Sequence, residues 1–294
     1  MDDRPFHLVD VFAEGRHTGN QLAVIRPAGD LTTAEMQALA REMHFSETTF
    51  VESETPTDGG FEVRIFTPNA ELEFAGHPTL GTAHVIREVV APDRPDEVAL
   101  NLGVGQIPVT VEGAGDDEVL WMTQRAPTFG ETLDPAVAAE AVGLTPADVA
   151  DDDPVQVVST GLPTLVVPLA SLDAVRRAET NLPVYRERVV EGLDVPNVLV
   201  FAPETVHAEN DLHVRMFAPA LGVSEDPATG SSNGCLAAYL ARHRTLGGPV
   251  VDARVEQGYE LERPSLLFLR AEDGDEVTVE VGGRVAWVAD GTLR

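Results

Sequence analysis

The feature that most constrains the fold is an internal repeat at an offset of 151 residues, since VRIFTP at 63–68 recurs as VRMFAP at 214–219. The same offset pairs Phe50 with Phe201, and both lie in short apolar, β-branched segments. A fixed period of this kind is typical of duplicated structural units. The sequence therefore predicts two copies of one fold unit.

Both copies present the same order of predicted elements. A helical segment, 32–43 in the first copy and 183–193 in the second, precedes an apolar strand, and a later strand ends in Phe-x-Pro. Each copy then passes through a glycine-containing loop into an apolar helix, in 71–89 and in 222–243. The first N–H groups of a helix are unpaired and carry about half a positive charge. Each copy is thus expected to offer an anion-binding helix end.

The rest of the chain is β-rich, because short or alternating apolar runs are separated by Gly, Asp and Pro turns. These runs lie at 6–12, 21–25, 98–101, 106–112, 118–123, 155–158, 164–168, 265–270, 276–281 and 284–289. A chain of 294 residues is long enough for two domains. We expect an N-terminal domain at 1–124, to which a last strand at about 282–294 returns, and a C-terminal domain at 125–281.

The charge of the chain excludes several classes of function. Asp and Glu number 49 against 20 basic residues, which gives a formal net charge of −29, and every basic residue is arginine. Without lysine there is no Schiff base to pyridoxal phosphate and no P-loop lysine for a nucleotide. So negative a chain repels nucleic acid and anionic membranes. A GC-rich genome would explain arginine in place of lysine, but not the net charge, so we favour a halophilic protein.

The N-terminal segment, the lengths of the apolar runs and the single cysteine lead us to expect a cytoplasmic protein. The N-terminal MDDRPFHLVDVF is acidic and is predicted to form a strand, so we expect neither a signal nor a transit peptide. No apolar run approaches the roughly 20 residues of a membrane span. Cys235 is the only cysteine and has no internal disulfide partner.

Three ionisable residues near the two loops are candidates for proton transfer. Glu47 begins an apolar strand in HFSETTFV, and its hydrophobic neighbours favour a partly buried general base. His77 and Asp226 lie in the two loops, which we expect to face one another across a cleft that holds an anion. Each also has a structural interpretation: Glu47 as a connector charge, His77 as a packed or capping histidine, and Asp226 as a turn former before proline. Thr229 and Ser231 are equally suited to cap a helix.

Other motifs do not carry chemistry. GSSNG at 230–234 matches the nucleophile elbow of α/β-hydrolases, but no buried strand precedes it and no acid separates it from the last histidine, His243. Gly103-Val104-Gly105 lacks the third glycine of a dinucleotide fingerprint. The Asp triplet at 151–153 reads as a solvated loop, and no His/Cys cluster suggests a metal.

Over nearly the full chain, the order and spacing of the motifs resemble the PhzF-like family of phenazine biosynthesis, related in fold to diaminopimelate epimerase. The matching segments are 6–25, HFSETTFV (44–51), 66–86, 214–240, EQGYELERPS (256–265) and 281–293. One departure is Gln21, where many members have proline. The resemblance implies an α+β fold of two pseudo-symmetric domains, each a curled, mostly antiparallel sheet or barrel around a central helix.

The resemblance also implies roles for individual residues. By matching positions, the catalytic residues are Glu47 as general base, His77 and Asp226. The residues implied to bind the substrate are Gly76, Thr229, Gly230, Ser231 and Asn20. Epimerases of this fold use a cysteine in each half. Here Ala75 and Pro227 stand beside the loops, and Cys235 lies within the following helix, which excludes a two-cysteine mechanism.

The expected function is that of an isomerase that moves a carbon-bound proton on a small carboxylate-bearing substrate by acid/base catalysis, with neither cofactor nor metal. The family suggests a homodimer. Two alternatives stay open at this point. One is a non-catalytic protein that binds a small acid, and the other is an amino-acid-type epimerase that uses Glu47 and Asp226 as its acid/base pair.

The acidic surface predicts that salt stabilises the fold. Repulsion between carboxylates is screened within roughly 3 Å at 1 M salt, so the midpoint of thermal unfolding should rise as potassium chloride is raised through the molar range. Differential scanning calorimetry at fixed pH measures the midpoint. A midpoint indifferent to salt would refute a halophilic origin of the charge.

Overall fold

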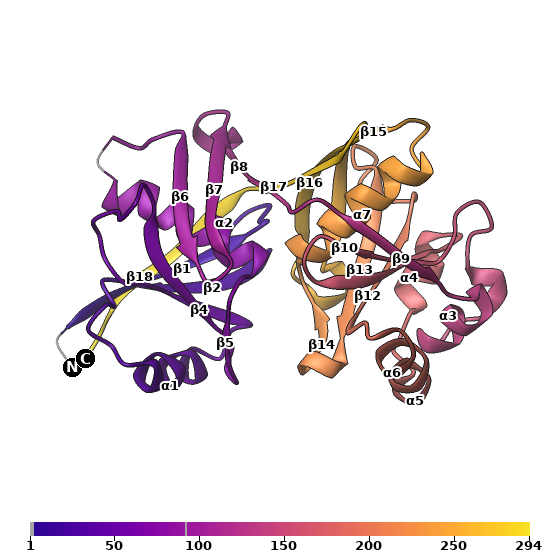
Figure 1. Ribbon diagram of the computed structural model, residues 1–294, viewed down its shortest axis with the longest axis horizontal. Helices are drawn as coiled ribbons and strands as arrows, with labels where there is room; N and C mark the ends of the chain where they lie inside the picture. The colour runs from indigo at the N-terminus through magenta and orange to yellow at the C-terminus, as the bar shows by residue number, and fades with distance from the viewer. Residues whose placement is uncertain (1–2, 92) are drawn as a thin grey trace. The chain divides into compact units, whose positions relative to one another are not determined.

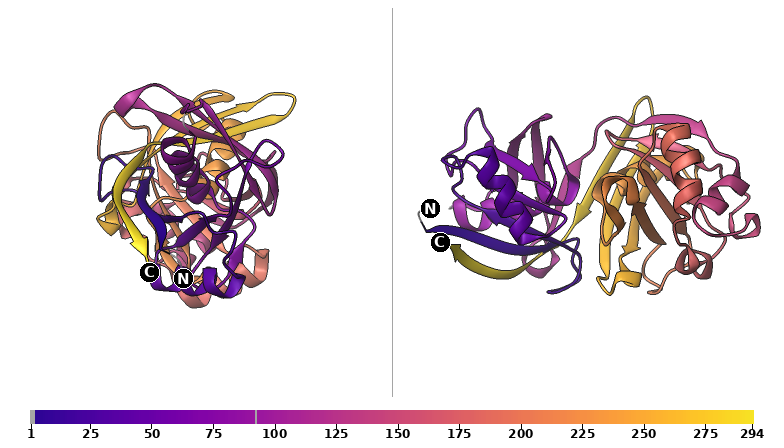
Figure 2. Two further views of the ribbon diagram at one scale, coloured as in Figure 1. Left: turned by 90° about the vertical axis from the view of Figure 1, so that its left-hand side faces the viewer. Right: turned by 90° about the horizontal axis from the view of Figure 1, so that it is seen from below.

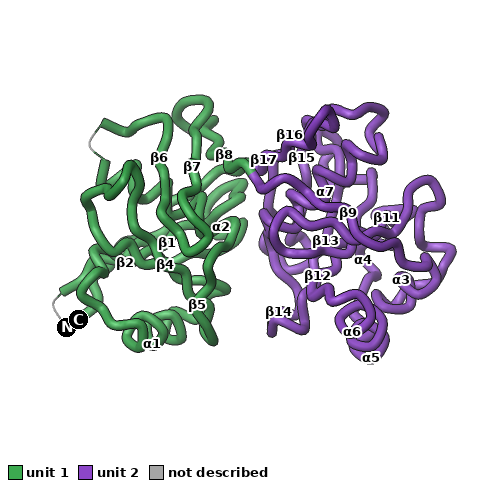
Figure 3. The backbone as a smooth tube through the Cα atoms, viewed as in Figure 1, with its two compact units in different colours: residues 1–123, 282–294 green, residues 124–281 purple. Residues whose placement is uncertain are grey.

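The computed structural model describes residues 3–91 and 93–294, and it divides into two compact units (Figure 3). Unit 1 comprises Met1–Thr123 and Gly282–Arg294, and unit 2 comprises Gln124–Val281. The chain crosses into unit 2 after β8 (Val119–Thr123) and returns through β17 (Val277–Gly283). No helix in the described residues is long and apolar enough to cross a membrane.

Unit 1 is built around one curved sheet. Its strands pair in the order β18–β1–β2–β3–β4–β6–β7–β8, and the short β5 pairs with the C-terminal end of β4. The bounds are β1 Arg4–Val11, β2 Asn20–Ile25, β3 Glu47–Val51, β4 Phe61–Phe66, β5 Glu71–Leu72, β6 Glu97–Leu102, β7 Gly105–Glu112 and β18 Val285–Leu293. The pairs β2–β3 and β4–β6 are parallel and the others antiparallel. Figure 2 shows β1 and β18 running side by side near the two termini.

A central helix fills the sheet of unit 1. α2 (Gly76–Val85) packs against β1, β2, β3, β6, β7, β8 and β18, and nearly all of its residues are buried. Glycine makes the close approach possible, because a Cβ at Gly81 would lie 2.6 Å from Leu22 and 2.8 Å from Val11. A helix that is buried on all sides needs small or apolar residues all round, as GHPTLGTAHV has.

Unit 2 repeats this topology (Figure 1). Its strands pair in the order β9–β10–β11–β12–β13–β15–β16, with β14 on β13, and here β11–β12 and β13–β15 are the parallel pairs. The bounds are β9 Thr128–Thr132, β10 Gln156–Ser159, β11 Pro163–Pro168, β12 Asn197–Ala202, β13 Leu212–Ala218, β14 Val223–Asp226, β15 Val250–Gln257 and β16 Ser265–Asp273. The central helix is α7 (Gly230–His243), which packs against β10, β11, β12, β15 and β16.

The remaining helices lie between the strands. In unit 1 they are α1 Thr33–Met43, the π-helix η1 Ile86–Val90 and the 3-10 turn η2 Gly115–Asp117. In unit 2 they are α3 Pro135–Ala141, η3 Pro146–Asp148, α4 Leu172–Arg177, α5 Leu182–Val184, the π-helix η4 Tyr185–Val190, α6 Glu191–Leu193, η5 Pro219–Leu221 and η6 Tyr259–Leu261. The helical segment predicted at 183–193 is thus mainly a π-helix.

Matching ion pairs mark the two copies of the duplicated unit. Nε and Nη2 of Arg64 on β4 donate to the two carboxylate oxygens of Glu71, both at 2.7 Å. Arg215 on β13 donates in the same way to Glu225, at 2.9 and 2.7 Å. Each guanidinium also lies over the phenylalanine two residues along its strand. The predicted α+β fold of two similar halves, each a largely antiparallel sheet around a helix, is confirmed.

The structure contains a long strand that the sequence analysis did not predict, β15. Its residues Val251, Ala253 and Val255 are buried in alternation, a period that could have revealed it. Asp252 and Arg254 stand between them in the sequence. β15 matters to the site because its last residue is Gln257.

A buried histidine ties β15 to β13. Nδ1 of His213 lies 2.8 Å from Glu256 and Nε2 lies 3.1 Å from Glu260. Burial disfavours the charge of His213, but the hydrogen bonds to Glu260 and Glu256 outweigh it and raise the pKa of the imidazole. Glu256 also accepts from the backbone of Val206 and His207, which holds the 203–211 loop against the sheet.

His213→Gln should destabilise the protein in a pH-dependent way. Because the folded-state pKa of His213 is raised, its contribution is fully present below the unfolded pKa of about 6.5 and is lost as pH rises through the folded value. Breaking a buried ion pair costs about 3–5 kcal/mol, so the loss should be near that size at pH 6 and smaller at pH 9. Urea unfolding at both pH values measures it. The exposed His207→Gln is the control, and an equal loss at both pH values would contradict the charged assignment.

Candidate active site

Four of the residues predicted for the site lie together in unit 1. Glu47 is the first residue of β3, Asn20 begins β2, and Gly76 and His77 open α2. Oε2 of Glu47 lies 3.4 Å from Nε2 of His77. The Glu47 side chain is 17% exposed and the His77 side chain 6% exposed. The carboxyl group of Glu47 and the imidazole of His77 therefore lie together in a largely buried position.

His77 is neutral at physiological pH, because burial lowers the pKa of its imidazole to about 3. The amide nitrogen of Asn20 lies 3.3 Å from Nδ1. Either ring nitrogen of a neutral imidazole can carry its single proton, and that choice decides whether Nδ1 donates or accepts here. Nε2 is the ring nitrogen that lies beside the Glu47 carboxylate.

The N-terminus of α2 adds backbone donors to this group. The helix begins at Gly76 after the extended residue Ala75, whose side chain forms no cap. First-turn N–H groups have no partner within a helix, and Pro78 has none to offer. The amides of Gly76 and His77 are therefore the ones that this helix end presents.

The other four predicted residues lie together in unit 2. Asp226 is the last residue of β14 and is 7% exposed. The Thr229 hydroxyl donates to Oδ2 of Asp226. α7 begins at Gly230, and half-buried Ser231 follows in its first turn. A carboxylate at a strand end is thus held directly before a helix N-terminus.

The two groups occupy equivalent places in the duplicated unit. Thr229 and Ala75 are the N-cap residues of α7 and α2, so Thr229 is the counterpart of Ala75. Of the two residues expected beside the loops, Ala75 is an N-cap residue, whereas Pro227 lies two residues before the N-cap of α7. Neither N-cap residue is a cysteine, so the exclusion of a two-cysteine mechanism does not depend on the pairing.

Sequence reasoning missed two residues that contact the unit 2 group. The Gln257 side chain bonds to Asp226 and Thr229, and Asn233 Nδ2 lies 2.8 Å from Oε1 of Gln257. Both residues are fully buried. Gln257 falls in the matched segment EQGYELERPS and Asn233 in GSSNG. The sequence alone did not indicate which residues either side chain contacts.

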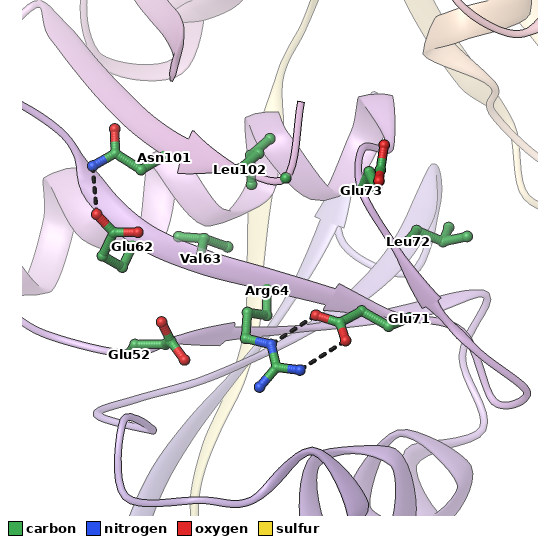
Figure 4. A pocket seen from close by; sticks show the side chains of 10 residues that line it. Glu52, Glu62, Val63, Arg64, Glu71, Leu72, Glu73, Asn101 and Leu102 are labelled. Carbon is green, nitrogen blue, oxygen red and sulfur yellow. Dashed lines mark hydrogen bonds and ion pairs between the residues drawn. The ribbon is translucent and has the colours of Figure 1, made fainter. Parts of the chain in front are cut away.

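Two cavities lie beside the repeated Arg–Glu pairs. In unit 1 a cavity of about 490 Å³ is lined by Arg64, Glu71 and further acidic residues (Figure 4). In unit 2 a cavity of about 420 Å³ is lined by Arg215, Glu225 and apolar side chains. Neither lining includes a predicted site residue. Both arginines are already paired, so these cavities present no free cation to a ligand.

Comparison with known proteins gives the class. The chain matches the family model of phenazine biosynthesis-like proteins (PhzC-PhzF) over residues 9–291. An uncharacterized isomerase of Mesorhizobium japonicum is 33% identical, with 100% of this chain and 99% of the relative covered. The trans-2,3-dihydro-3-hydroxyanthranilate isomerase of Pseudomonas aeruginosa is 38% identical, with 97% of each covered. A solved PhzF-family structure from Bacillus anthracis is 26% identical, covers 100% of both chains and has a TM-score of 0.90.

The fold and these relatives define an enzyme, an isomerase. The chain belongs to the family of phenazine biosynthesis-like proteins. The family, the fold and the isomerase class predicted from the sequence are therefore confirmed.

The neutral state of His77 can be observed directly. The ring resonances of His77 in histidine-labelled protein should stay constant between pH 5 and pH 8, because burial lowers the pKa to about 3. NMR of the ring nuclei measures this, with the signal assigned by its absence in His77→Gln. A titration midpoint near the ordinary value of about 6.5 would contradict it.

Proposed function

We propose that this chain is a cofactor-independent isomerase that moves a carbon-bound proton on a small substrate bearing a carboxylate. The trans-2,3-dihydro-3-hydroxyanthranilate on which the Pseudomonas aeruginosa relative acts represents that class. The observation that carries the proposal is the pair of Glu47 and neutral His77, with their side-chain atoms 3.4 Å apart. An ionisable carboxyl and an uncharged donor at one place are the elements of proton transfer at carbon.

Glu47 is the proposed general base. Its backbone is fixed by the parallel pairing of β3 with β2, and the following Thr48 and Thr49 are buried. Its side chain keeps only a small exposed fraction. A base held this way can approach a carbon acid without rearrangement of the backbone, and low exposure limits competition from water.

His77 is the proposed hydrogen-bond donor beside the base. In this proposal the neutral imidazole carries its proton on Nε2 when substrate is bound and donates there, without adding a positive charge that would hold Glu47 as a permanent ion pair. Such a donor stabilises a carboxylate, or an anion that develops on the substrate, while it leaves the base able to accept a proton. Asn20 contacts the ring at Nδ1, on the side away from Glu47.

The helix ends are proposed to hold the anionic parts of the substrate. The amides of Gly76, Gly230 and Ser231 lie in the first turns of α2 and α7. A helix N-terminus favours a carboxylate or a developing oxyanion through unpaired N–H groups and its dipole. In this proposal, backbone N–H donors supply the positive potential with which a chain of net charge −29 and no lysine binds an anion.

Asp226 is proposed as the second acid/base group, with Thr229 in contact with it and Ser231 and Asn20 in the substrate-binding set. The division into two epimerase-like domains, the homodimer, the cytoplasmic location and the halophilic surface remain predictions from the sequence and its family resemblance.

Glu47→Gln should abolish proton exchange. In heavy water the wild type should incorporate deuterium into trans-2,3-dihydro-3-hydroxyanthranilate, and the variant should do so at least about 100-fold more slowly, because a positioned general base contributes roughly 10²–10⁴-fold. Mass spectrometry and NMR of the product measure the rate and the position of the label. Glu42→Gln, an exposed change on α1 of the same unit, is the matched control.

Two results decide against this assignment. Exchange undiminished in folded Glu47→Gln would remove the role of general base. Exchange by the wild type at the α-carbon of an amino acid, lost in both Glu47→Gln and Asp226→Asn, would instead support an amino-acid-type epimerase.

A further inference from the structure

We propose that Gln257 is a positioning residue that fixes the Asp226 carboxylate through the Thr229 hydroxyl. The inference rests on the proposed function insofar as Asp226 takes part in proton transfer. Gln257 is fully buried at the end of β15 and is not itself expected to touch the substrate. Its side chain is directed at the loop that carries Asp226.

The Gln257 amide uses all of its hydrogen-bonding capacity on this loop and the helix after it. Oε1 accepts from the backbone N–H of Thr229 at 3.2 Å and from Nδ2 of Asn233 at 2.8 Å. Nε2 donates to the backbone carbonyl of Asp226 at 2.8 Å and to Oγ1 of Thr229 at 3.2 Å. A backbone N–H only donates and a carbonyl only accepts, so the orientation of the amide is fixed.

This orientation sets the direction of the next hydrogen bond. Because Oγ1 of Thr229 accepts from Gln257, the hydroxyl proton of Thr229 is left to donate, and it donates to Oδ2 of Asp226. A chain of two hydrogen bonds thus runs from Gln257 to the carboxylate. Linked hydrogen bonds of this kind polarise one another in a buried place.

The strand that carries Gln257 is a rigid support for the loop. The residue after it, Gly258, has φ +78°, and a Cβ there would lie 2.5 Å from the carbonyl oxygen of Pro227. The residue before it, Glu256, bonds His213 on β13. The end of β15 is therefore held to the sheet while it lies directly against the site loop.

Unit 1 shows that the fold itself does not need this amide. In the shared register Ile65 pairs with Leu72 as Met216 pairs with Asp226, so Leu72 is the counterpart of Asp226. Ala75 is the N-cap counterpart of Thr229. The parallel pairs β4–β6 and β13–β15 align Asn101 with Glu256, so the residues that follow, Leu102 and Gln257, are counterparts. All three positions are apolar in unit 1 and polar in unit 2. Thr229 and Gln257 are therefore polar only in the unit that also carries Asp226, which supports a role for them at the site.

Substitutions at Gln257 separate positioning from general stability. Gln257→Glu keeps the acceptors for Thr229 and Asn233 but removes both N–H donors, and it offers the Thr229 hydroxyl a competing acceptor. Gln257→Leu removes all four hydrogen bonds. Asn197→Asp is the matched control, because Asn197 is a buried amide of unit 2 that bonds Pro163 and no residue of the loop.

The first measurement is amide hydrogen exchange of the full chain without ligand. Peptides that cover 226–233 should exchange about tenfold faster in both Gln257 variants, because the local hydrogen bonds that close this segment are lost. In Asn197→Asp these peptides should exchange as in the wild type. Each protein is measured the same number of degrees below its own thermal unfolding midpoint. Unchanged exchange in the Gln257 variants, or an equal change in the control, would overturn the proposal whatever reaction the protein catalyses.

The second measurement is steady-state kinetics with trans-2,3-dihydro-3-hydroxyanthranilate. Gln257→Glu should lower kcat about tenfold and change KM by less than about threefold, because it misplaces a reacting group rather than a binding contact. In a Thr229→Val background the same change should have little further effect on kcat, since the two residues act in series. Losses that simply add would overturn the action through Thr229. A wild type without turnover would count against the proposed function alone, because hydrogen exchange still decides the positioning role.

Discussion

The near-complete burial of one helix inside each sheet is the constraint on which the rest of this structure depends. α2 and α7 are surrounded by strands and are therefore rich in Gly, Ala, Ser and Thr. A helix enclosed in this way cannot satisfy its first N–H groups from its own turns. The sheet therefore holds the first N–H groups of its helix in a fixed position and orientation in each unit. The site residues are those that stand beside these helix starts.

The two units share one scaffold but carry different polar residues at their helix starts. Unit 1 places the Glu47 carboxylate and the neutral His77 at its helix start, whereas unit 2 places Asp226 and the hydroxyl of Thr229. The paired strands and the Arg–Glu bridges are the same in both. Conserved supports with diverged polar groups are what a reaction with distinct acid and base functions requires.

The sequence was informative where structure is local or periodic. The repeat, the strands with alternating apolar residues and the helices with glycine at their starts all follow from short-range patterns. The same patterns could not reveal Gln257, whose partners Asp226 and Thr229 lie 31 and 28 residues earlier in the chain. The neutral state of His77 was also out of reach, because it comes from the burial that α2 acquires only when the sheet closes around it.

The absence of lysine takes on a structural meaning in the buried arginines. Nη1 of Arg215 contacts the carbonyl oxygens of Val175, Arg176 and Ala178, while its Nε and Nη2 bond Glu225. Only a planar guanidinium can bond both oxygens of a carboxylate and still reach the carbonyls at the end of α4. An ammonium group at this position would leave several acceptors unsatisfied in a buried place, at a cost of about 1–3 kcal/mol each. At Arg215, then, the fold needs arginine on geometric grounds, whatever first removed lysine from the surface.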